Sequence, residues 1–335
     1  MISSRGQRSQ MEEEMANVYV TCRVFTEEIE RLRIAGHTVV MRDASGPIEP
    51  DELLENVGEA DALMCLLSDR IDSEVIDRGK RLRIIANLGV GYDNIDVATA
   101  REHGIVVTNT PGALTETTAD LAFALLLSAA RRIVEADAYT RAGKFRGWEL
   151  MQPHLGLDVY GKTLGIVGMG RIGTAVARRG HLGFGMPVLY HNRHRNELAE
   201  RELDARWVPF ETLLAESDFV CVHTPLTPDT RHLFDRDAFR RMKRTAILVN
   251  VARGPVVDEE ALVWALETGE IAGAGIDVYE REPKVHPGLV KLRERVVLTP
   301  HIGSASEETR RALARIAVDN VLAVLAGKPP LTPVS

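Results

Sequence analysis

Apolar residues along the first third of the chain fall into short runs separated by stretches with helical spacing. The runs predict buried strands at residues 18–22, 38–41, 62–67, 82–87 and 105–108. Helices are predicted between some of them, at residues 27–35 and 50–57. Strands that are apolar throughout and alternate with helices predict a parallel sheet that is covered on both faces.

The same alternation returns in the second half of the chain. Strands are predicted at residues 164–167, 187–190, 218–223, 246–250, 272–278 and 295–299. A long Ala/Leu-rich helix is predicted from residue 115 to 143, and a last helix from 305 to 326, whereas residues 145–160 show no periodicity. The predicted fold class is therefore α/β, with two doubly wound parallel-sheet domains. One domain comprises residues 16–112 plus 300–335, and the other, residues 113–299, is inserted into it.

Composition limits the class of protein. Residues 1–15 are polar and lack the apolar core of a signal peptide, so they are predicted to be a disordered tail or a cloning remnant. The longest apolar run, residues 121–127, is too short to span a bilayer, which predicts a soluble, cytoplasmic protein without a membrane partner. The net charge of −7 argues against a nucleic-acid partner.

The three cysteines, Cys22, Cys65 and Cys221, lie singly inside apolar runs. They lack the C-x-x-C spacing of a metal or redox site, so they are predicted to be buried thiols in a reducing compartment. No metal site is predicted.

A glycine-rich turn follows the predicted strand at residues 164–167. Gly168, Gly170 and Gly173 have the spacing G-x-G-x-x-G, and small residues that predict a helix come next. The first glycine makes the tight turn, the second lets the backbone approach a pyrophosphate, and the third lets the helix pack closely on the strand. The helix N-terminus adds free N–H groups and a positive dipole end. The turn predicts a dinucleotide site, and an ordinary strand-to-helix turn is the alternative.

The residues after the next strand bear on which dinucleotide is bound. An NAD site usually carries Asp or Glu about 20 residues after the glycines, where it holds the ribose hydroxyls. This chain instead has His191-Asn192-Arg193-His194-Arg195, and its first acidic residue there is Glu197. Cationic side chains suit a 2′-phosphate, so NADP(H) is predicted to be preferred and NAD(H) to be possible. The alternative is a solvated basic loop that tolerates either cofactor.

Further candidate residues follow other predicted strands. The turn at residues 88–91 can offer backbone N–H groups to an anion such as a carboxylate, although a purely structural turn is an equal alternative. Arg253, Glu282 and His301 follow three of the late strands, where open α/β sheets bind ligands. A cation can bind a carboxylate and polarise a ketone, an imidazole can deliver a proton, and a carboxylate can orient the imidazole. Each residue alone could be a surface charge or a packing histidine, but together they predict reduction of a carbonyl group.

These motifs, in this order, resemble the D-isomer-specific 2-hydroxyacid dehydrogenase family, and most of all its glyoxylate/hydroxypyruvate reductase branch. The matching stretches are residues 90–96, 109–112, 158–173, 249–254, 275–278 and 300–304. The resemblance implies a Rossmann-type coenzyme domain inserted into a flavodoxin-like substrate-binding domain. It also implies a homodimer, because Trp148 matches a loop tryptophan that reaches the neighbouring subunit's pocket in some relatives.

The resemblance assigns roles to residues of this chain. Arg253, Glu282 and His301 match the catalytic arginine, glutamate and histidine. Substrate contacts are implied at Leu66, Val90, Gly91, Trp148, Arg253 and His301. Cofactor contacts are implied at Thr118, Gly168, Met169, Gly170, Arg171, Ile172, Gly173, Asn192, Arg193, His194, His223, Pro225, Val251, Ala252, Arg253, Asp277, His301 and Gly303.

The expected activity is the reduction of a small 2-oxoacid, glyoxylate or hydroxypyruvate, to glycolate or D-glycerate with NADPH preferred. An NAD-dependent D-3-phosphoglycerate, D-lactate or other D-2-hydroxyacid dehydrogenase is an alternative. It is less favoured because the cofactor loop is basic and the chain ends soon after its last helix. A dinucleotide-sensing, corepressor-like binding protein is an alternative of another class, and a structural oligomer with vestigial sites is a further one.

Overall fold

The computed structural model describes residues 15–44 and 46–334. The predicted tail at residues 1–15 lies outside the described residues, except for Met15. The chain divides into two compact units, one running up to Ala113 and resuming at Arg310, and the other spanning Leu114–Thr309. The sequence placed these divisions after residues 112 and 299.

The first unit contains a parallel sheet of five strands in the order β2-β1-β3-β4-β5. This is the order of a flavodoxin-like fold. The strands are β1 (Asn17–Val20), β2 (Thr38–Met41), β3 (Ala62–Cys65), β4 (Ile84–Asn87) and β5 (Val106–Thr108). The helices are α1 (Thr26–Ile34), α2 (Pro50–Val57), α3 (Ser73–Arg78), α4 (Val97–Glu102) and α13 (Glu307–Leu325).

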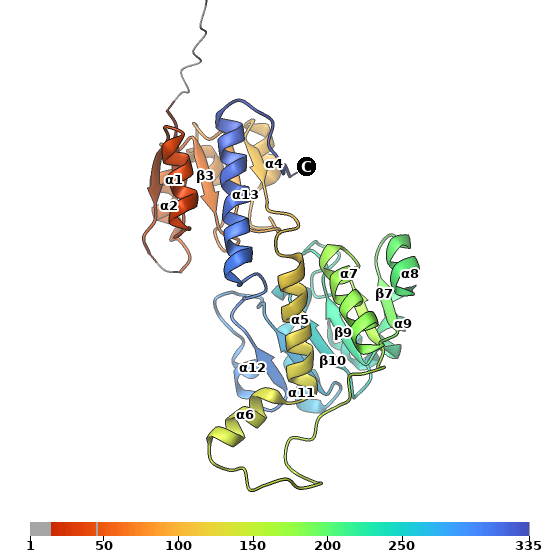
Figure 1. The fold of residues 1–335 in the computed structure, drawn as a ribbon. Helices are drawn as coiled ribbons and strands as arrows, with labels where there is room; N and C mark the ends of the chain where they lie inside the picture. The colour runs from red at the N-terminus through yellow and green to blue at the C-terminus, as the bar shows by residue number, and fades with distance from the viewer. Residues whose placement is uncertain (1–14, 45, 335) are drawn as a thin grey trace, which may run out of the picture. The chain divides into compact units, whose positions relative to one another are not determined.

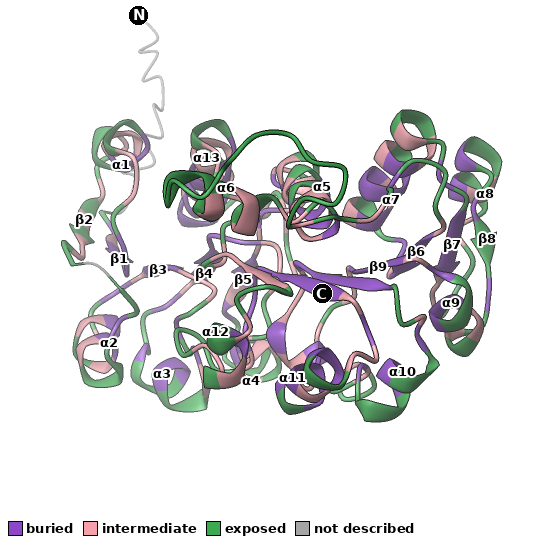
Figure 2. Cartoon of the chain, turned by 90° about the horizontal axis from the view of Figure 1, so that it is seen from below, coloured by how far each residue is buried: buried purple, intermediate pink, exposed green. Residues whose placement is uncertain are grey.

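Helices cover both faces of this first sheet, as its fully apolar strands predict. On one face, Ile29 and Leu32 of α1 and Val318 and Val321 of α13 pack on the strands. On the other face the strands meet α2, α3 and α4, and Figure 2 shows these two helical layers on opposite sides of the buried strands. The central strands β3 and β4 are buried along their whole length.

The second unit contains seven parallel strands in the order β12-β11-β10-β9-β6-β7-β8. Strand order reverses at β6, as in a Rossmann-type fold. The strands are β6 (Leu164–Val167), β7 (Val188–His191), β8 (Arg206–Trp207), β9 (Phe219–Val222), β10 (Ile247–Asn250), β11 (Gly273–Ile276) and β12 (Val296–Leu298).

The helices of this unit also form two layers (Figure 2). One layer contains α5 (Thr115–Ala130), α7 (Arg171–Arg178) and α8 (Glu197–Leu203). The other contains α9 (Phe210–Glu216), α10 (Arg236–Arg241), α11 (Glu259–Thr268) and α12 (Pro287–Lys291). Short turns of π-helix (Arg179–Gly183) and 3-10 helix (Gly254–Val256) complete the unit. Two parallel-sheet α/β folds are thus present, as the sequence predicts.

The single helix predicted at residues 115–143 is wrong. The structure has two helices, α5 and α6 (Ile133–Arg141), separated at Arg132, whose φ of 53° is in the left-handed region. The chain returning toward β6 passes the end of α5, where the Leu157 N–H donates to the Ala130 carbonyl at 2.8 Å. Residues 130–133 contain no glycine or proline, so the sequence carries no local signal for this break.

The segment between α6 and β6 forms an arm that loops away from the sheet of its own unit (Figure 1). It has no helix or strand at residues 145–160, as the sequence predicts. Most of its apolar side chains are exposed, with Trp148 at 80% and Met151 at 78%, whereas Val159 is buried.

Candidate active site

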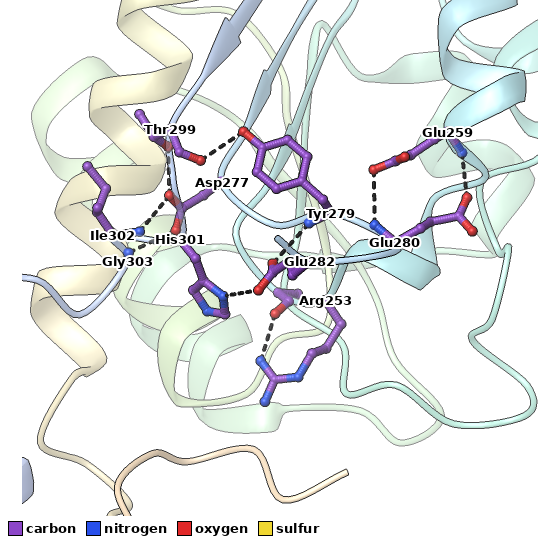
Figure 3. A network of polar contacts seen from close by, with 11 residues as sticks. Arg253, Glu259, Asp277, Tyr279, Glu280, Glu282, Thr299, His301, Ile302 and Gly303 are labelled. Carbon is purple, nitrogen blue, oxygen red and sulfur yellow. Dashed lines mark hydrogen bonds and ion pairs between the residues drawn. The ribbon is translucent and has the colours of Figure 1, made fainter. Parts of the chain in front are cut away.

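Arg253, Glu282 and His301 lie together at one end of the second sheet (Figure 3). They follow β10, β11 and β12, which are neighbours in the sheet and run parallel. Parallel strands end at the same edge, so residues far apart in the sequence converge there.

The imidazole of His301 is paired with the carboxylate of Glu282. His301 Nδ1 lies 2.8 Å from Glu282 Oε2, and the other carboxylate oxygen accepts the Tyr279 N–H at 3.0 Å. Burial opposes ionisation of Glu282, but the hydrogen bond and charge of His301, the Tyr279 N–H and the Arg253 charge outweigh it and lower the pKa of Glu282. Glu282 is therefore an ionised partner that fixes the orientation of the ring.

Asp277 holds the loop that carries His301. One carboxylate oxygen accepts the Thr299 hydroxyl at 2.6 Å and the Ile302 N–H at 2.8 Å, and the other accepts the Gly303 N–H at 2.8 Å. These bonds support the left-handed backbone of His301, whose φ is 53°. Burial raises the pKa of Asp277 despite the hydrogen bonds it receives. Its predicted cofactor contact stays a prediction, but its position is that of a clamp on this loop.

Tyr279 contributes to the same loop, although the sequence pattern does not mark it as a site residue. Its hydroxyl donates to the Thr299 carbonyl at 2.9 Å, in addition to the bond from its N–H to Glu282. Burial raises the pKa of Tyr279 to about 12, so the hydroxyl stays protonated as a donor. Tyr279 lies in the segment after β11, close to Asp277 in the sequence, and this position is the only sequence signal for it.

Arg253 is positioned by the turn after β10. Asn250 spans this turn, with its Nδ2 donating to the Arg253 carbonyl at 3.0 Å and its Oδ1 accepting the Ala252 N–H at 3.0 Å. The next residue, Gly254, lies so close to the chain after β11 that a Cβ there would be 2.0 Å from the Tyr279 carbonyl carbon. Only glycine permits this approach, which sets Arg253 beside the segment that carries Glu282.

The glycine turn lies between β6 and α7, as the sequence predicts. Gly168 has a φ of +103°, and a Cβ there would be 2.6 Å from the His223 carbonyl carbon. A Cβ at Gly173 would be 2.1 Å from the Gly168 carbonyl oxygen, whereas at Gly170 it would meet no atom within 4 Å. The turn is thus packed on the protein side and open at Gly170, as a phosphate cradle requires.

The loop after β7 is tied to this turn by two asparagines. Asn192 Oδ1 accepts the Met169 N–H at 2.6 Å, and Asn196 Nδ2 donates to the Met169 carbonyl at 3.0 Å. Arg195 is held by Glu200 at 2.6 Å. Arg193 and His194 are exposed, and their side chains make no ion pair or hydrogen bond with the residues that the structure describes. Of the basic residues in this loop, these two are therefore available to a ligand.

His223 lies next to the glycine turn with both ring nitrogens covered. Neither nitrogen, nor the hydroxyl of Thr224, has a hydrogen-bond partner within residues 15–44 and 46–334. Burial lowers the pKa of His223 to about 3, which keeps the ring neutral. Covered polar atoms without partners are costly, and a bound ligand at this edge would satisfy them.

Thr118, Asp277 and Gly303 adjoin one another in this unit. A Cβ added at Gly303 would lie 3.3 Å from Asp277 Oδ2 and 3.5 Å from Thr118 Cγ2. The remaining predicted substrate residues lie elsewhere: Leu66, Val90 and Gly91 are half-buried residues of the first unit, and Trp148 is on the exposed arm.

The sequence of the second unit matches a described family. The model of the D-isomer specific 2-hydroxyacid dehydrogenase, NAD binding domain, matches residues 123–303. A glyoxylate reductase of Korarchaeum cryptofilum is 57% identical over 281 residues, which cover 83% of each chain.

Solved structures agree over nearly the whole chain. The TT0316 protein of Thermus thermophilus has a TM-score of 0.89 and 48% identity, covering 95% of this chain and 100% of its own. An NADPH-dependent glyoxylate/hydroxypyruvate reductase of Sinorhizobium meliloti, in complex with NADP and malonate, has a TM-score of 0.83 and 35% identity. It covers 96% of this chain and 97% of its own.

Proposed function

The chain belongs to the D-isomer-specific 2-hydroxyacid dehydrogenase family, and we propose that it reduces glyoxylate and hydroxypyruvate to glycolate and D-glycerate, preferably with NADPH. The observation that carries this proposal is the 2.8 Å pair of His301 and an ionised Glu282 beside Arg253. The names of relatives at 57% and 35% identity support the choice of substrates.

Each of the three residues has a role in this proposal. Arg253 binds the substrate carboxylate and polarises the ketone oxygen. His301 donates a proton from Nε2 to the oxygen as negative charge develops on it, because Nδ1 is engaged by Glu282. Glu282 holds the ring in this orientation and stabilises its protonated form, and the proton is regained from solvent after the reaction.

The second unit holds the dinucleotide in this proposal, and the first unit binds the substrate carboxylate through the Val90 and Gly91 N–H groups. The open position at Gly170, the free N–H groups at the start of α7 and the unpartnered His223 all fit such a cofactor. When bound, the dinucleotide supplies the hydride that C2 of the 2-oxoacid receives.

NADPH is favoured over NADH because of the loop after β7. Its residues 191–195 contain no carboxylate to hold a ribose hydroxyl, and Arg193 and His194 are exposed. A 2′-phosphate would give Arg193 a bidentate partner. The solved relative whose name states NADPH dependence contains NADP, which agrees with this proposal.

We also propose that the chain forms a homodimer through the arm at residues 145–160. Phe145, Trp148, Leu150 and Met151 are 60–80% exposed, and a second copy of the chain would remove this apolar surface from water.

The free, buried thiols of the three cysteines accord with a reducing compartment such as the cytoplasm. Among the described residues, no helix is long and apolar enough to cross a membrane.

The direct test is oxidation of NADPH and NADH, followed by absorbance, with glyoxylate, hydroxypyruvate, pyruvate and 3-phosphohydroxypyruvate. Fast NADPH-linked turnover of the first two substrates is expected. Strict use of NADH with the phosphorylated substrate would overturn the proposed substrate and cofactor preference. Tight cofactor binding without turnover of any substrate would favour a dinucleotide-sensing binding protein instead.

A further inference from the structure

In the turn after β4, the carbonyl groups of Gly89, Val90 and Gly91 are hydrogen-bonded to other residues of the first unit. Asn87 Nδ2 donates to the Gly91 carbonyl at 2.6 Å and reaches the Gly89 carbonyl at 3.4 Å. Asn109 Nδ2 donates to the intervening Val90 carbonyl at 2.7 Å. The Thr110 N–H donates to the Gly89 carbonyl at 3.1 Å. Three consecutive carbonyl oxygens are therefore held by donors from the ends of β4 and β5.

The N–H groups of the same turn have no such partners. The N–H groups of Gly89, Val90 and Gly91 donate no hydrogen bond to another part of the described chain. Val90 and Gly91 are only half-buried, so a ligand can reach them. The N–H groups of the turn are therefore free to donate while its carbonyl oxygens are occupied, which is the arrangement that binds an anion.

The length of this turn does not by itself decide whether its N–H groups or its carbonyl groups face the ligand. A peptide unit carries one donor and one acceptor that point in opposite directions, so a rotation of the turn would present carbonyl oxygens to the ligand. The two amide side chains prevent this rotation. Asn87 is fully buried, and the backbone of Asn109 is held by Thr332, whose hydroxyl donates to the Asn109 carbonyl at 2.5 Å.

We propose that Asn87 and Asn109 are positioning residues that keep the Val90 and Gly91 N–H groups directed at the substrate carboxylate. This inference rests on the proposed function, because the turn has a substrate to hold only if the enzyme acts on a 2-oxoacid. Each asparagine acts through the backbone of the turn. Its loss should therefore weaken substrate binding without changing the proton transfer at His301.

Asn109 is the residue to change, because it is half-buried and its loss should leave the fold intact. Asn109→Ser replaces the amide donor with a shorter hydroxyl that cannot span the same distance, and Asn109→Asp places a negative charge against the Val90 carbonyl and next to the anion. Asn17→Asp is the charge-matched control, because Asn17 is the first residue of β1, at the end of the parallel strands opposite to the turn, and donates to the Glu59 carbonyl.

The measurements are KM for glyoxylate, kcat, the NADPH dissociation constant and the calorimetric affinity for oxalate, a dicarboxylate that cannot be reduced. We expect KM and the oxalate dissociation constant to rise about tenfold in Asn109→Ser and further in Asn109→Asp. NADPH affinity, thermal stability and turnover of the uncharged aldehyde glyoxal should change much less. Asn17→Asp should resemble wild type in every measurement.

Two outcomes overturn the inference. One is unchanged glyoxylate KM and oxalate affinity in both Asn109 variants. The other is an equal loss for glyoxal and glyoxylate, which would mean a general structural defect. Failure of the proposed function is a separate result, namely no glyoxylate turnover by wild type. In that case the oxalate titration still decides the inference, and wild type that binds no oxalate also overturns it.

Discussion

Replacing Glu282 with glutamine tests the proposed chemistry most directly. The amide keeps the size of the side chain and can still accept a hydrogen bond from His301 Nδ1, but it removes the negative charge 2.8 Å from the ring. The carboxylate charge beside the ring is then lost. We expect a lower kcat for 2-oxoacid reduction with little change in the dissociation constant of NADPH.

The geometry limits the size of this effect. A hydrogen bond to a charged group contributes about 1.5–3 kcal/mol net, and the higher values apply to well-buried pairs. The side chains of His301 and Glu282 are 33% and 34% exposed, so solvent screens the pair and the lower part of that range applies. At about 1.4 kcal/mol per tenfold change, kcat should fall by about tenfold to thirtyfold.

The pH profile separates a charge effect from a packing effect. In wild type the lowered pKa of Glu282 keeps its carboxylate ionised below the usual range of a glutamate, so kcat should fall only once the pH is acidic enough to protonate Glu282. Glu282→Gln has no carboxylate to titrate, so its lower kcat should lack this acid limb.

The chain supplies a matched control in a second histidine–glutamate pair. Glu280, two residues before Glu282 in the sequence, has its Oε2 3.2 Å from His232 Nε2. The other carboxylate oxygen of Glu280 accepts the Glu259 N–H (Figure 3). Glu280→Gln should keep the wild-type kcat and pH profile. Wild-type kcat and an unchanged acid limb in Glu282→Gln would refute the proposed role of the pair.

Three further predictions follow from other parts of the second unit. Gly170→Ala should raise the NADPH dissociation constant about tenfold and leave Tm unchanged, because its Cβ meets no atom within 4 Å. Gly173→Ala should lower both NADPH affinity and Tm, because its Cβ would be 2.1 Å from the Gly168 carbonyl oxygen. Equal Tm values for the two variants would contradict this reasoning. Arg193→Glu should raise KM for NADPH far more than for NADH, and equal effects would rule out a phosphate contact. The free energy of unfolding should decrease by up to about 1.4 kcal/mol per pH unit as the pH falls from about 6.5 toward 3, because His223 takes up a proton in the unfolded chain but not in the folded one. In denaturant titrations at several pH values, the unfolding free energy of His223→Gln should depend less steeply on pH.

Most of the strand pattern could be predicted from the sequence because buried parallel strands are apolar on both faces. β6 and β10 are examples, since every residue in them is buried. The edge strand β8 was missed because its two residues, Arg206 and Trp207, are exposed and carry no such pattern. The break between α5 and α6 was missed for a different reason. At the end of α5 the Ala130 carbonyl accepts a hydrogen bond from the N–H of Leu157, a residue far along the chain, and the local sequence does not show this contact.

The sequence alone determined which chemical groups are present and which strands they follow. The glycine spacing, the basic loop after β7, and Arg253, Glu282 and His301 at strand ends are all local features of the chain. Only the tertiary structure decided how these groups act on one another. The pairing of Glu282 with His301, the clamp that Asp277 forms and the carbonyl groups held by Asn87 and Asn109 depend on segments that parallel strands bring to the same edge. Hydrogen bonds act over about 3 Å, and sequence spacing carries no information about distances of that size between separate strands.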